Sequence, residues 1–554
     1  MKNRLTFFFI ISAFLFTTSC TKDWLDINDD PNAPTTPELS QLLSGSQRYM
    51  TSALGQGNFI GNNLSSYTHH LVSREVQNYG MTTTANNIYN SWNYFYIYSL
   101  IDFDAIIKNA EPDGNLIYAG IAKTLKAYTF SMMVDLWGDV PYSEYNIPGL
   151  TAPKADKSAS IYNSVIALLE EGLADLQNST AANPLKPGDD DFFYSGNKDK
   201  WIRLNNTIKL KLLLQTRLAK SDITDWQKRL SDLITANNFI ASGEDFQFWY
   251  TAKLSPDERH PTFVSEYANK GTTHYISPYF YEMMKGLTYN NTKNPFAGIT
   301  DPRVPYYFYN QLKTGQAAQN NHSYREGNFL TIFFADNGSN NAGDQSSSMS
   351  KVGIYLCGGK YDDGNGGAVS ANTGNGVAPL KLVTFHSLKF MLAELALTGE
   401  INGDAKALFK EGMNASIAHV NTVAAKQSNI PTIATADRDA FTTSVLAKYD
   451  AASDAGKLEI IMTQKWIGNI FSPEDAYTDY RRTGYPELFN PANTADPGYG
   501  VNPTVTALSP ARVPIAPIVS FPRSLYYPTT TETDLNPNLE QKTNLSAKFI
   551  FWDK

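Results

Sequence analysis

Apolar residues recur every three or four positions through much of this 554-residue chain, and that spacing favours helices over strands. From residue 117 to residue 137 they fall on one helical face, and Gly138 stands where a glycine commonly ends a helix. The same pattern follows at 161–176, with Ser158 or Ser160 as the expected N-cap. Further stretches with this period are 201–218, 382–397, 405–420 and 457–471. The alternation of helix, short turn and helix predicts a mostly α-helical fold, built as an array of helical hairpins.

Two parts of the chain lack the helical period. Residues 285–380 are rich in Gly, Asn, Ser and Tyr, which favours long irregular loops and short strands. Loops carried on a helical scaffold often perform recognition. The end of the chain, 486–554, is irregular and rich in proline, and it closes on the aromatic run 549–552. We expect this aromatic run to be docked into the body of the protein.

The N-terminus has the features of a lipoprotein signal peptide over residues 1–19. Lys2 and Arg4 precede an apolar stretch that is too short to span a bilayer, and small or hydroxyl residues then lead to Cys20. We expect cleavage before Cys20, acylation of its sulfur, and an extended leader over 20–40. The alternative is an ordinary signal peptide with an incidental cysteine. The mature chain would then be a soluble body on a lipid tether, with Cys357 as a small core residue.

Composition and motifs exclude several classes of function. The net charge is −8 and no basic run stands out, so nucleic acid is not expected as a partner. The sequence contains no G-x-S-x-G, H-E-x-x-H, phosphate-binding or dinucleotide-binding motif. We therefore predict no catalytic residues and no enzyme activity. A surface glycoside hydrolase stays open as an alternative, because that chemistry needs only two carboxylates that the fold brings together.

No metal site or cofactor is predicted. The adjacent histidines His69 and His70 would be a poor metal pair on a helix. The acidic runs 189–191 and 362–367 do not alternate oxygen ligands as a calcium loop does, so we interpret both as solvated loops. Calcium at the second run is possible but unsupported.

The clearest chemical signal is a stretch rich in aromatic and amide side chains at 86–98. A sugar ring has an apolar C–H face, which flat aromatic rings can cover, and a rim of hydroxyls, which amides can bind. The stretch offers both groups, although each aromatic residue in it could instead pack in the core. The candidate ligand contacts are Trp92, Tyr89, Asn87, Asn93, Tyr79 and Tyr275.

Several short strings occur in the order found in one known family. The chain resembles the SusD/RagB family of outer-membrane nutrient-binding lipoproteins, and the resemblance covers nearly the whole mature chain. The strings are Cys20–Asn32, Asp135–Tyr142, Trp201–Asn206, Arg259–Pro261, Gln464–Ile467, Arg481–Pro486 and Phe521–Pro528.

This resemblance implies a fold of tetratricopeptide-like helix pairs with irregular ligand-binding loops. It implies one SusD-like domain over 41–554, with a helical scaffold at about 41–240 and 380–485, a loop-rich ligand-binding insertion at about 241–380, and an irregular segment at 486–554. It also implies that the motif tryptophans Trp137, Trp201 and Trp466 anchor helix packing.

The resemblance further implies a location and a partner. Family members are lipid-anchored on the outer face of the outer membrane, where each caps a SusC-like TonB-dependent transporter. They deliver oligosaccharides, or peptides in RagB-type members, without cleaving them. Glycan capture is therefore the leading hypothesis. A peptide cargo, and a scaffold that binds only protein, are the other binding hypotheses.

Overall fold

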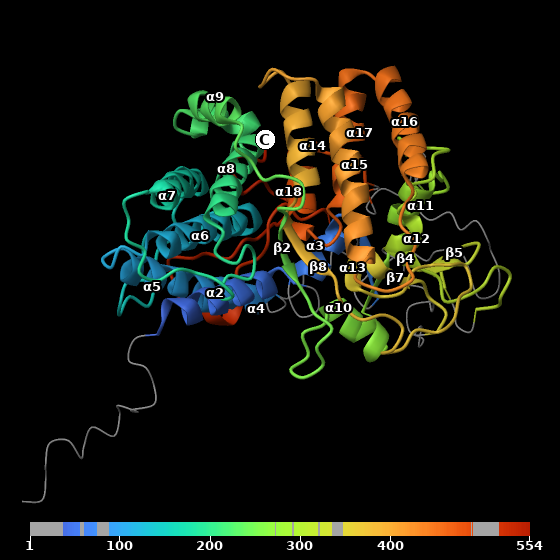
Figure 1. The fold of residues 1–554 in the computed structure, drawn as a ribbon, viewed down its shortest axis with the longest axis horizontal. Coiled ribbons are helices and arrows are strands. Elements are labelled where there is room, and N and C mark those ends of the chain that lie inside the picture. The colour runs from blue at the N-terminus through green and yellow to red at the C-terminus, as the bar shows by residue number, and fades with distance from the viewer. Residues whose placement is uncertain are drawn as a thin grey trace, which may run out of the picture.

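The computed structural model describes residues 37–55, 60–74, 88–271, 273–290, 293–318, 322–334, 347–488, 490 and 520–554. The described part of the chain is mostly α-helical, as predicted, and its strands form two-stranded antiparallel sheets (Figure 1). Among these residues, no helix is both long and apolar enough to cross a membrane.

The longer helices are α2 (Leu39–Ala53), α3 (Ile60–Tyr67), α4 (Tyr89–Phe95), α5 (Ile101–Ala110), α6 (Leu116–Trp137), α7 (Ser158–Gln177), α8 (Lys198–Gln215), α9 (Trp226–Ala236), α11 (Pro278–Lys285), α14 (Phe385–Leu397), α15 (Ala405–Ala424), α16 (Thr435–Ala451), α17 (Asp454–Gly468) and α18 (Pro473–Thr483). The shorter helical segments are the π-helices η4 (Tyr96–Leu100), η6 (Val264–Ala268) and η8 (Thr529–Thr533), the 3-10 helix η5 (Arg217–Asp222), α10 (Pro261–Phe263), α12 (Val304–Tyr307) and α13 (Ile354–Cys357). The strands pair as β1 (Leu71–Ser73) with β3 (His274–Ile276), β2 (Phe246–Trp249) with β8 (Pro379–Val383), β4 (Phe308–Tyr309) with β7 (Lys351–Val352), and β5 (Tyr324–Glu326) with β6 (Phe329–Thr331).

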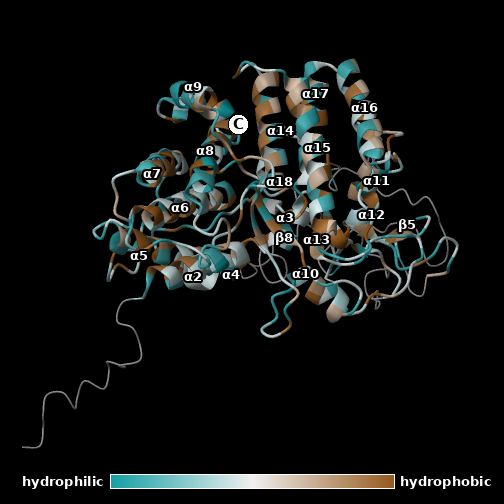
Figure 2. Ribbon diagram, viewed as in Figure 1, coloured by the Kyte–Doolittle hydropathy of each residue, from teal (hydrophilic) through white to brown (hydrophobic). Residues whose placement is uncertain are grey.

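Sequential helices pack as pairs, which confirms the tetratricopeptide-like arrangement. The helices α6 and α7 lie against each other, as do α14 and α15, and α16 and α17 stand beside the second pair (Figure 1). Two glycines allow the first pair to approach closely, because a Cβ atom on Gly120 would lie 2.7 Å from the carbonyl oxygen of Gly172. In Figure 2 the ribbon of α14 is coloured largely as hydrophobic, which agrees with the packing of this mostly buried helix against α15 and α17.

Helix boundaries follow the sequence pattern where a local signal sets them. The helix α6 ends at Trp137, and Gly138 follows with φ 82°, as predicted. The expected serine N-cap of α7 is wrong: Lys157 is the N-cap, and the backbone N–H of Ser158 donates to Asp139 Oδ1 at 2.8 Å. The helix expected from residue 382 begins at Phe385, because residues 379–383 form β8 against β2.

The aromatic C-terminus is docked into the body, as predicted. Trp552 is completely buried, and its indole Nε1 donates to Asp135 Oδ1 at 2.8 Å. The hydroxyl of Tyr162 donates to the same oxygen at 2.5 Å. Arg481 donates through Nη2 to the Asp135 carbonyl oxygen at 2.5 Å. One residue of the 135–142 motif therefore joins α6, α7, α18 and the end of the chain.

The acidic run 189–191 is not a solvated loop throughout, which corrects the sequence-based interpretation. Asp191 is buried and accepts hydrogen bonds from Trp201 Nε1 at 2.7 Å and from Gln47 Nε2 at 3.0 Å. In the second run Asp362 accepts a hydrogen bond from Asn310 Nδ2 at 2.6 Å, whereas Asp363 is exposed. Across the described ranges, no group of three or more His, Cys, Asp or Glu side chains could hold a metal ion.

The remaining sequence landmarks lie in the core. Trp137, Trp201 and Trp466 are buried, which confirms their packing role, and Cys357 is a buried free cysteine. The two adjacent histidines are buried as well, and the His70 ring stacks on Trp466 with centroids 4.4 Å apart.

A buried ion pair connects α14 to α18. The Glu394 carboxylate and the Arg482 guanidinium are both fully buried and meet through two parallel hydrogen bonds, of which Nη2 to Oε2 measures 2.8 Å. Removing one charge would leave the other desolvated without its full complement of partners, and such losses typically destabilise a protein by several kcal/mol.

We therefore expect Glu394→Gln to lower the free energy of unfolding by about 3 kcal/mol, measured by chemical denaturation. The control is Glu411→Gln, because Glu411 is 55% exposed and pairs with Lys389 at the surface. That control should change stability by no more than about 0.5 kcal/mol. Equal effects of the two substitutions would contradict a structural role for the buried pair.

Candidate functional site

The aromatic residues predicted to contact ligand divide into buried and exposed members. Trp92 is 1% exposed, and its ring meets Trp137 edge-on with centroids 5.2 Å apart. Tyr275 is 2% exposed and lies in β3, opposite Val72 of β1. These placements favour core packing for both residues, which is the alternative that the sequence left open.

Two other predicted contacts reach the surface. Tyr89, the first residue of α4, is 37% exposed, and Asn93 lies one turn later and is partly exposed. Both therefore stay available as ligand contacts. The remaining predicted positions, Tyr79, Asn87 and the lipidation site Cys20, lie outside the described residues.

The structure places three tyrosines beside these residues, and we call them the tyrosine face: Tyr49, Tyr94 and Tyr98. The rings of Tyr49 and Tyr98 stack with centroids 4.7 Å apart and an interplanar angle of 24°. Tyr94 meets both rings edge-on, at 5.1 and 5.5 Å. The stacked pair stays accessible, since Tyr49 is 36% exposed and Tyr98 is 42% exposed. Helices α2 and η4 thus carry a partly exposed aromatic cluster at the surface.

The tyrosine face lies at a π-helical turn. The chain passes from α4 into η4 at Tyr96 and continues as α5 from Ile101, and the hydroxyl of Ser99 donates to the carbonyl oxygen of Tyr94 at 2.7 Å. Single π-helical turns inside α-helices are frequent at functional sites.

Aromatic packing anchors the helical segment that carries Tyr94 and Tyr98. Tyr96 packs on Trp92 with centroids 4.9 Å apart, and its hydroxyl donates to the carbonyl oxygen of Pro141 at 2.7 Å. Trp92 in turn contacts Trp137, which ends α6. The 135–142 motif therefore holds the helix that carries the tyrosine face, and the surface is set before any ligand arrives.

A carboxylate lies next to the stacked pair. A Cβ atom on Gly45 of α2 would lie 3.9 Å from Asp102 Oδ2 of α5. Tyr49 follows Gly45 by one helical turn, and Asp102 follows Tyr98 by four residues, so the carboxylate lies in the contact between α2 and α5, about one turn along each helix from the two rings. Burial raises the pKa of Asp102 from 3.8 to about 6. At neutral pH this group is ionised and can accept hydrogen bonds.

Apolar side chains complete the surface. Ile97 is 50% exposed and Ile101 is 40% exposed, and both lie on the helix that carries Tyr98. The combination of flat rings, aliphatic groups, an amide at Asn93 and a carboxylate at Asp102 matches a ligand that has an apolar face and a hydroxylated rim. Sequence reasoning missed Tyr49, because α2 gives no local sign that it packs against residue 98.

Comparisons with solved structures agree with this fold. A chitin-binding protein is 21% identical, with 93% of this chain and 100% of that chain covered and a TM-score of 0.63. A SusD homologue from Bacteroides fragilis is 17% identical, covers 94% of this chain and 100% of that chain, and has a TM-score of 0.65. A chitin-binding SusD homologue from Flavobacterium johnsoniae is 18% identical, with 93% and 97% covered and a TM-score of 0.61. At these identities the likeness shows the fold alone.

A family model gives the assignment. No curated protein sequence matches the chain. The SusD-like family model, described as "Starch-binding associating with outer membrane", matches residues 31–504. This match covers most of the chain and agrees with the helix pairs and the motif positions described above. The chain therefore belongs to the SusD-like family.

Proposed function

We propose that this protein captures oligosaccharides at the surface of the outer membrane and passes them on unaltered. The observation that carries the proposal is the partly exposed Tyr49–Tyr98 stack, with Asn93 and Asp102 on the same continuous helical segment as Tyr98, in a chain of the SusD-like family. The family is described as starch-binding, and two of the similar structures are chitin-binding proteins, which supports sugars as the ligand class.

The tyrosine face suits reversible capture. Aromatic contacts supply roughly 1 kcal/mol each beyond the area that they bury. A few such contacts with two or three hydrogen bonds reach about −8 kcal/mol, which corresponds to a micromolar dissociation constant. Because the rings of Tyr49, Tyr94 and Tyr98 already pack on one another, binding orders few side chains. Such a site holds a sugar chain and still releases it.

The rest of the proposed function follows from family membership. We propose that acyl chains on Cys20 anchor the protein, that the leader over 20–40 tethers the body, and that a SusC-like TonB-dependent transporter receives the cargo. The protein binds and does not cleave. The family description, association with the outer membrane, supports this arrangement.

Replacing Tyr98 with alanine tests the tyrosine face. We expect Tyr98→Ala to weaken binding of maltooligosaccharides or chitin oligosaccharides about tenfold, because the stacked platform is lost while the fold is kept. Isothermal titration calorimetry measures the change. Phe192→Ala is the control, since Phe192 is 44% exposed and packs on Phe248 instead. If Tyr98→Ala and the control bind equally well, the tyrosine face is not the site.

The raised pKa of Asp102 leads us to expect that the affinity for sugar depends on pH. Its raised pKa means that it loses its proton, and becomes a full hydrogen-bond acceptor, as the pH rises through about 6. Affinity for the same sugars should therefore increase between pH 5 and pH 7.5, and Asp102→Asn should abolish this step.

The raised pKa of Asp102 also predicts that the stability of the protein changes with pH, in the direction opposite to the affinity. The folded state favours the protonated carboxyl, so the contribution of Asp102 to stability falls as the pH rises from about 4 to about 6. Thermal unfolding of the wild type and of Asp102→Asn over this range measures the difference. A binding step near pH 6 that survives in Asp102→Asn would assign the titration to another group.

Lipid anchoring is tested at Cys20. Cys20→Ala should abolish incorporation of labelled palmitate and shift the protein from the membrane fraction to the soluble fraction. A Cys357→Ala variant should keep both properties, because Cys357 is buried in the core. Membrane association of Cys20→Ala without acyl label would contradict the anchor.

A further inference from the structure

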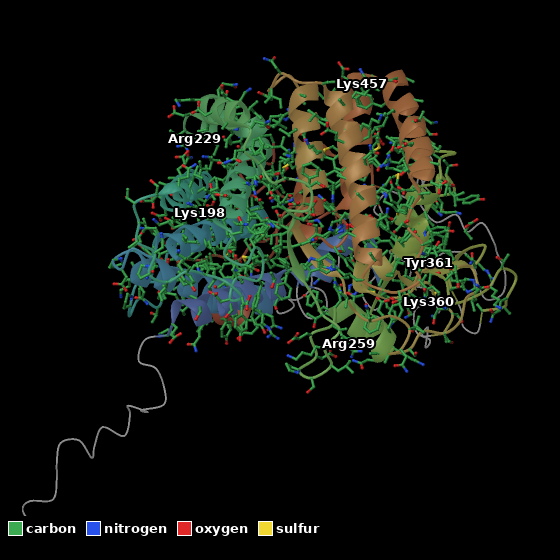
Figure 3. All side chains as sticks on the ribbon, viewed as in Figure 1. Lys198, Arg229, Arg259, Lys360, Tyr361 and Lys457 are labelled. Atoms are coloured by element: carbon green, nitrogen blue, oxygen red, sulfur yellow. The ribbon has the colours of Figure 1, made fainter. Side chains whose placement is uncertain are left out.

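A groove lies far from the tyrosine face. It encloses about 760 Å³ between α12, α16 and the segment 431–433, and Tyr361 forms part of its wall. Figure 3 shows Tyr361 at the right of the molecule, whereas α2 and α5 lie at the left in Figure 1. Its volume is within the range of roughly 300–1,000 Å³ that is typical of ligand-binding clefts.

The floor of the groove is aromatic and aliphatic. Tyr306, Phe441 and Ile433 line it and are at most 8% exposed. The ring of Tyr361 meets Tyr306 at a steep angle, with centroids 4.9 Å apart, and stays partly exposed. Tyr361 is therefore the aromatic ring in the groove that a ligand can reach most easily.

The walls are held in place by hydrogen bonds. The hydroxyl of Tyr306 donates to the carbonyl oxygen of Pro431 at 2.6 Å. The side chain of Asn421 in α15 bonds both backbone groups of Ile433, accepting from its N–H at 2.8 Å and donating to its carbonyl oxygen at 3.2 Å. The groove is thus formed without a ligand, which limits the entropy lost on binding.

The charges of the groove nearly cancel. Asp301 is one of its lining residues, but Arg303 binds that carboxylate, with Nε donating to Oδ1 at 2.9 Å and Nη2 donating to Oδ2 at 2.5 Å. The other charged residues of the lining are one cation, Lys285, and one anion, Asp437. Three hydroxyl residues also line it: Thr300, Thr432 and Ser444. A neutral ligand with many hydroxyls fits this lining better than a charged one.

The backbone of the groove disfavours an extended peptide. Pro302, Pro305 and Pro431 line it, and proline has no backbone N–H with which to bond the carbonyl groups of a peptide strand. Recognition by strand addition needs a row of free N–H and C=O groups. A ligand that is bound through side-chain hydroxyls and ring contacts does not need them.

We infer that the groove between α12 and α16 is a second carbohydrate-binding site, in which Tyr361 covers the face of a sugar ring while Asp437, Lys285 and the hydroxyl residues bind its rim. The inference deepens the proposed function and rests on it. Two sites on one molecule would raise the affinity for chains long enough to occupy both, because the second contact becomes intramolecular.

The test titrates the full chain with maltooligosaccharides and chitin oligosaccharides of increasing length. For the sugar series that binds, calorimetry with short oligosaccharides should give two sites per molecule in the wild type and one in Tyr361→Ala. Asp437→Asn should weaken the affinity of the groove for the oligosaccharide at least threefold. Asp439→Asn is the matched control, because Asp439 lies on the same helix, is exposed and is not part of the lining.

Hydrogen exchange locates the sites independently. Sugar should protect backbone amides at 298–306 and 431–444 in addition to those at 39–53 and 89–102. If sugar protects only residues 39–53 and 89–102, and the wild type has one site per molecule, the groove is not a binding site. That result would still agree with sugar binding at the tyrosine face. Protection of the groove by a peptide mixture and not by sugars also overturns the inference. Binding of neither sugar series, with no protection anywhere, counts against the proposed function itself.

Discussion

The buried carboxylate of Asp135 is the constraint on which much of the N-terminal half depends. Burial raises the pKa of Asp135, and the nearby cations Lys211 and Arg481 and the hydrogen bonds from Tyr162 and Trp552 oppose that rise. A buried carboxylate destabilises the fold unless donors or cations surround it. The four elements that supply these groups, which are α7, α8, α18 and the C-terminal tail, must therefore meet at one place. Through its carboxylate and its backbone carbonyl oxygen, Asp135 thus fixes where α7, α18 and the C-terminal tail lie relative to α6.

The position of the candidate site follows from the end of α6. Trp137 lies two residues after Asp135, and its indole Nε1 donates to the carbonyl oxygen of Tyr526 at 2.8 Å. Trp92 packs on Trp137, Tyr96 packs on Trp92, and the tyrosine face occupies the outer side of the same helical segment. A mostly buried motif therefore aligns the helix that carries the surface that we propose to bind sugar.

The sequence was informative where structure is decided locally. Gly138 marked the end of α6 because a glycine readily adopts the positive φ that this turn requires. The docked tail was predictable from the density of aromatic residues at 549–552. The buried state of Asp191 was not, because an acidic run in a polar loop gives no sign that Trp201 and Gln47 will come from two different helices to bind it.

In the candidate site, too, the sequence indicated what is decided locally and not what depends on tertiary packing. A stretch rich in tyrosine, tryptophan and asparagine pointed to the helix that carries two rings of the tyrosine face, but it could not say which side chains face outward. That choice depends on the side of α4 and η4 that packs against Trp137, and the packing turned Trp92 inward and left Tyr98 and Tyr89 exposed. Tyr49 belongs to another helix altogether, and only the packing of α2 against η4 brings it into the stack.

The two surfaces that we propose to bind sugar share one physical arrangement. Each contains a tyrosine that donates its hydroxyl to the carbonyl oxygen of a proline: Tyr96, on the helical segment of the tyrosine face, donates to Pro141, and Tyr306, in the groove, donates to Pro431. Such a bond satisfies the one polar group of a buried tyrosine and locks its ring. In the groove the locked ring of Tyr306 contacts the more exposed ring of Tyr361, so a sugar loses little entropy in ordering that ring. Shallow, rigid contacts of this kind favour fast exchange, which is what a protein that hands its cargo onward requires.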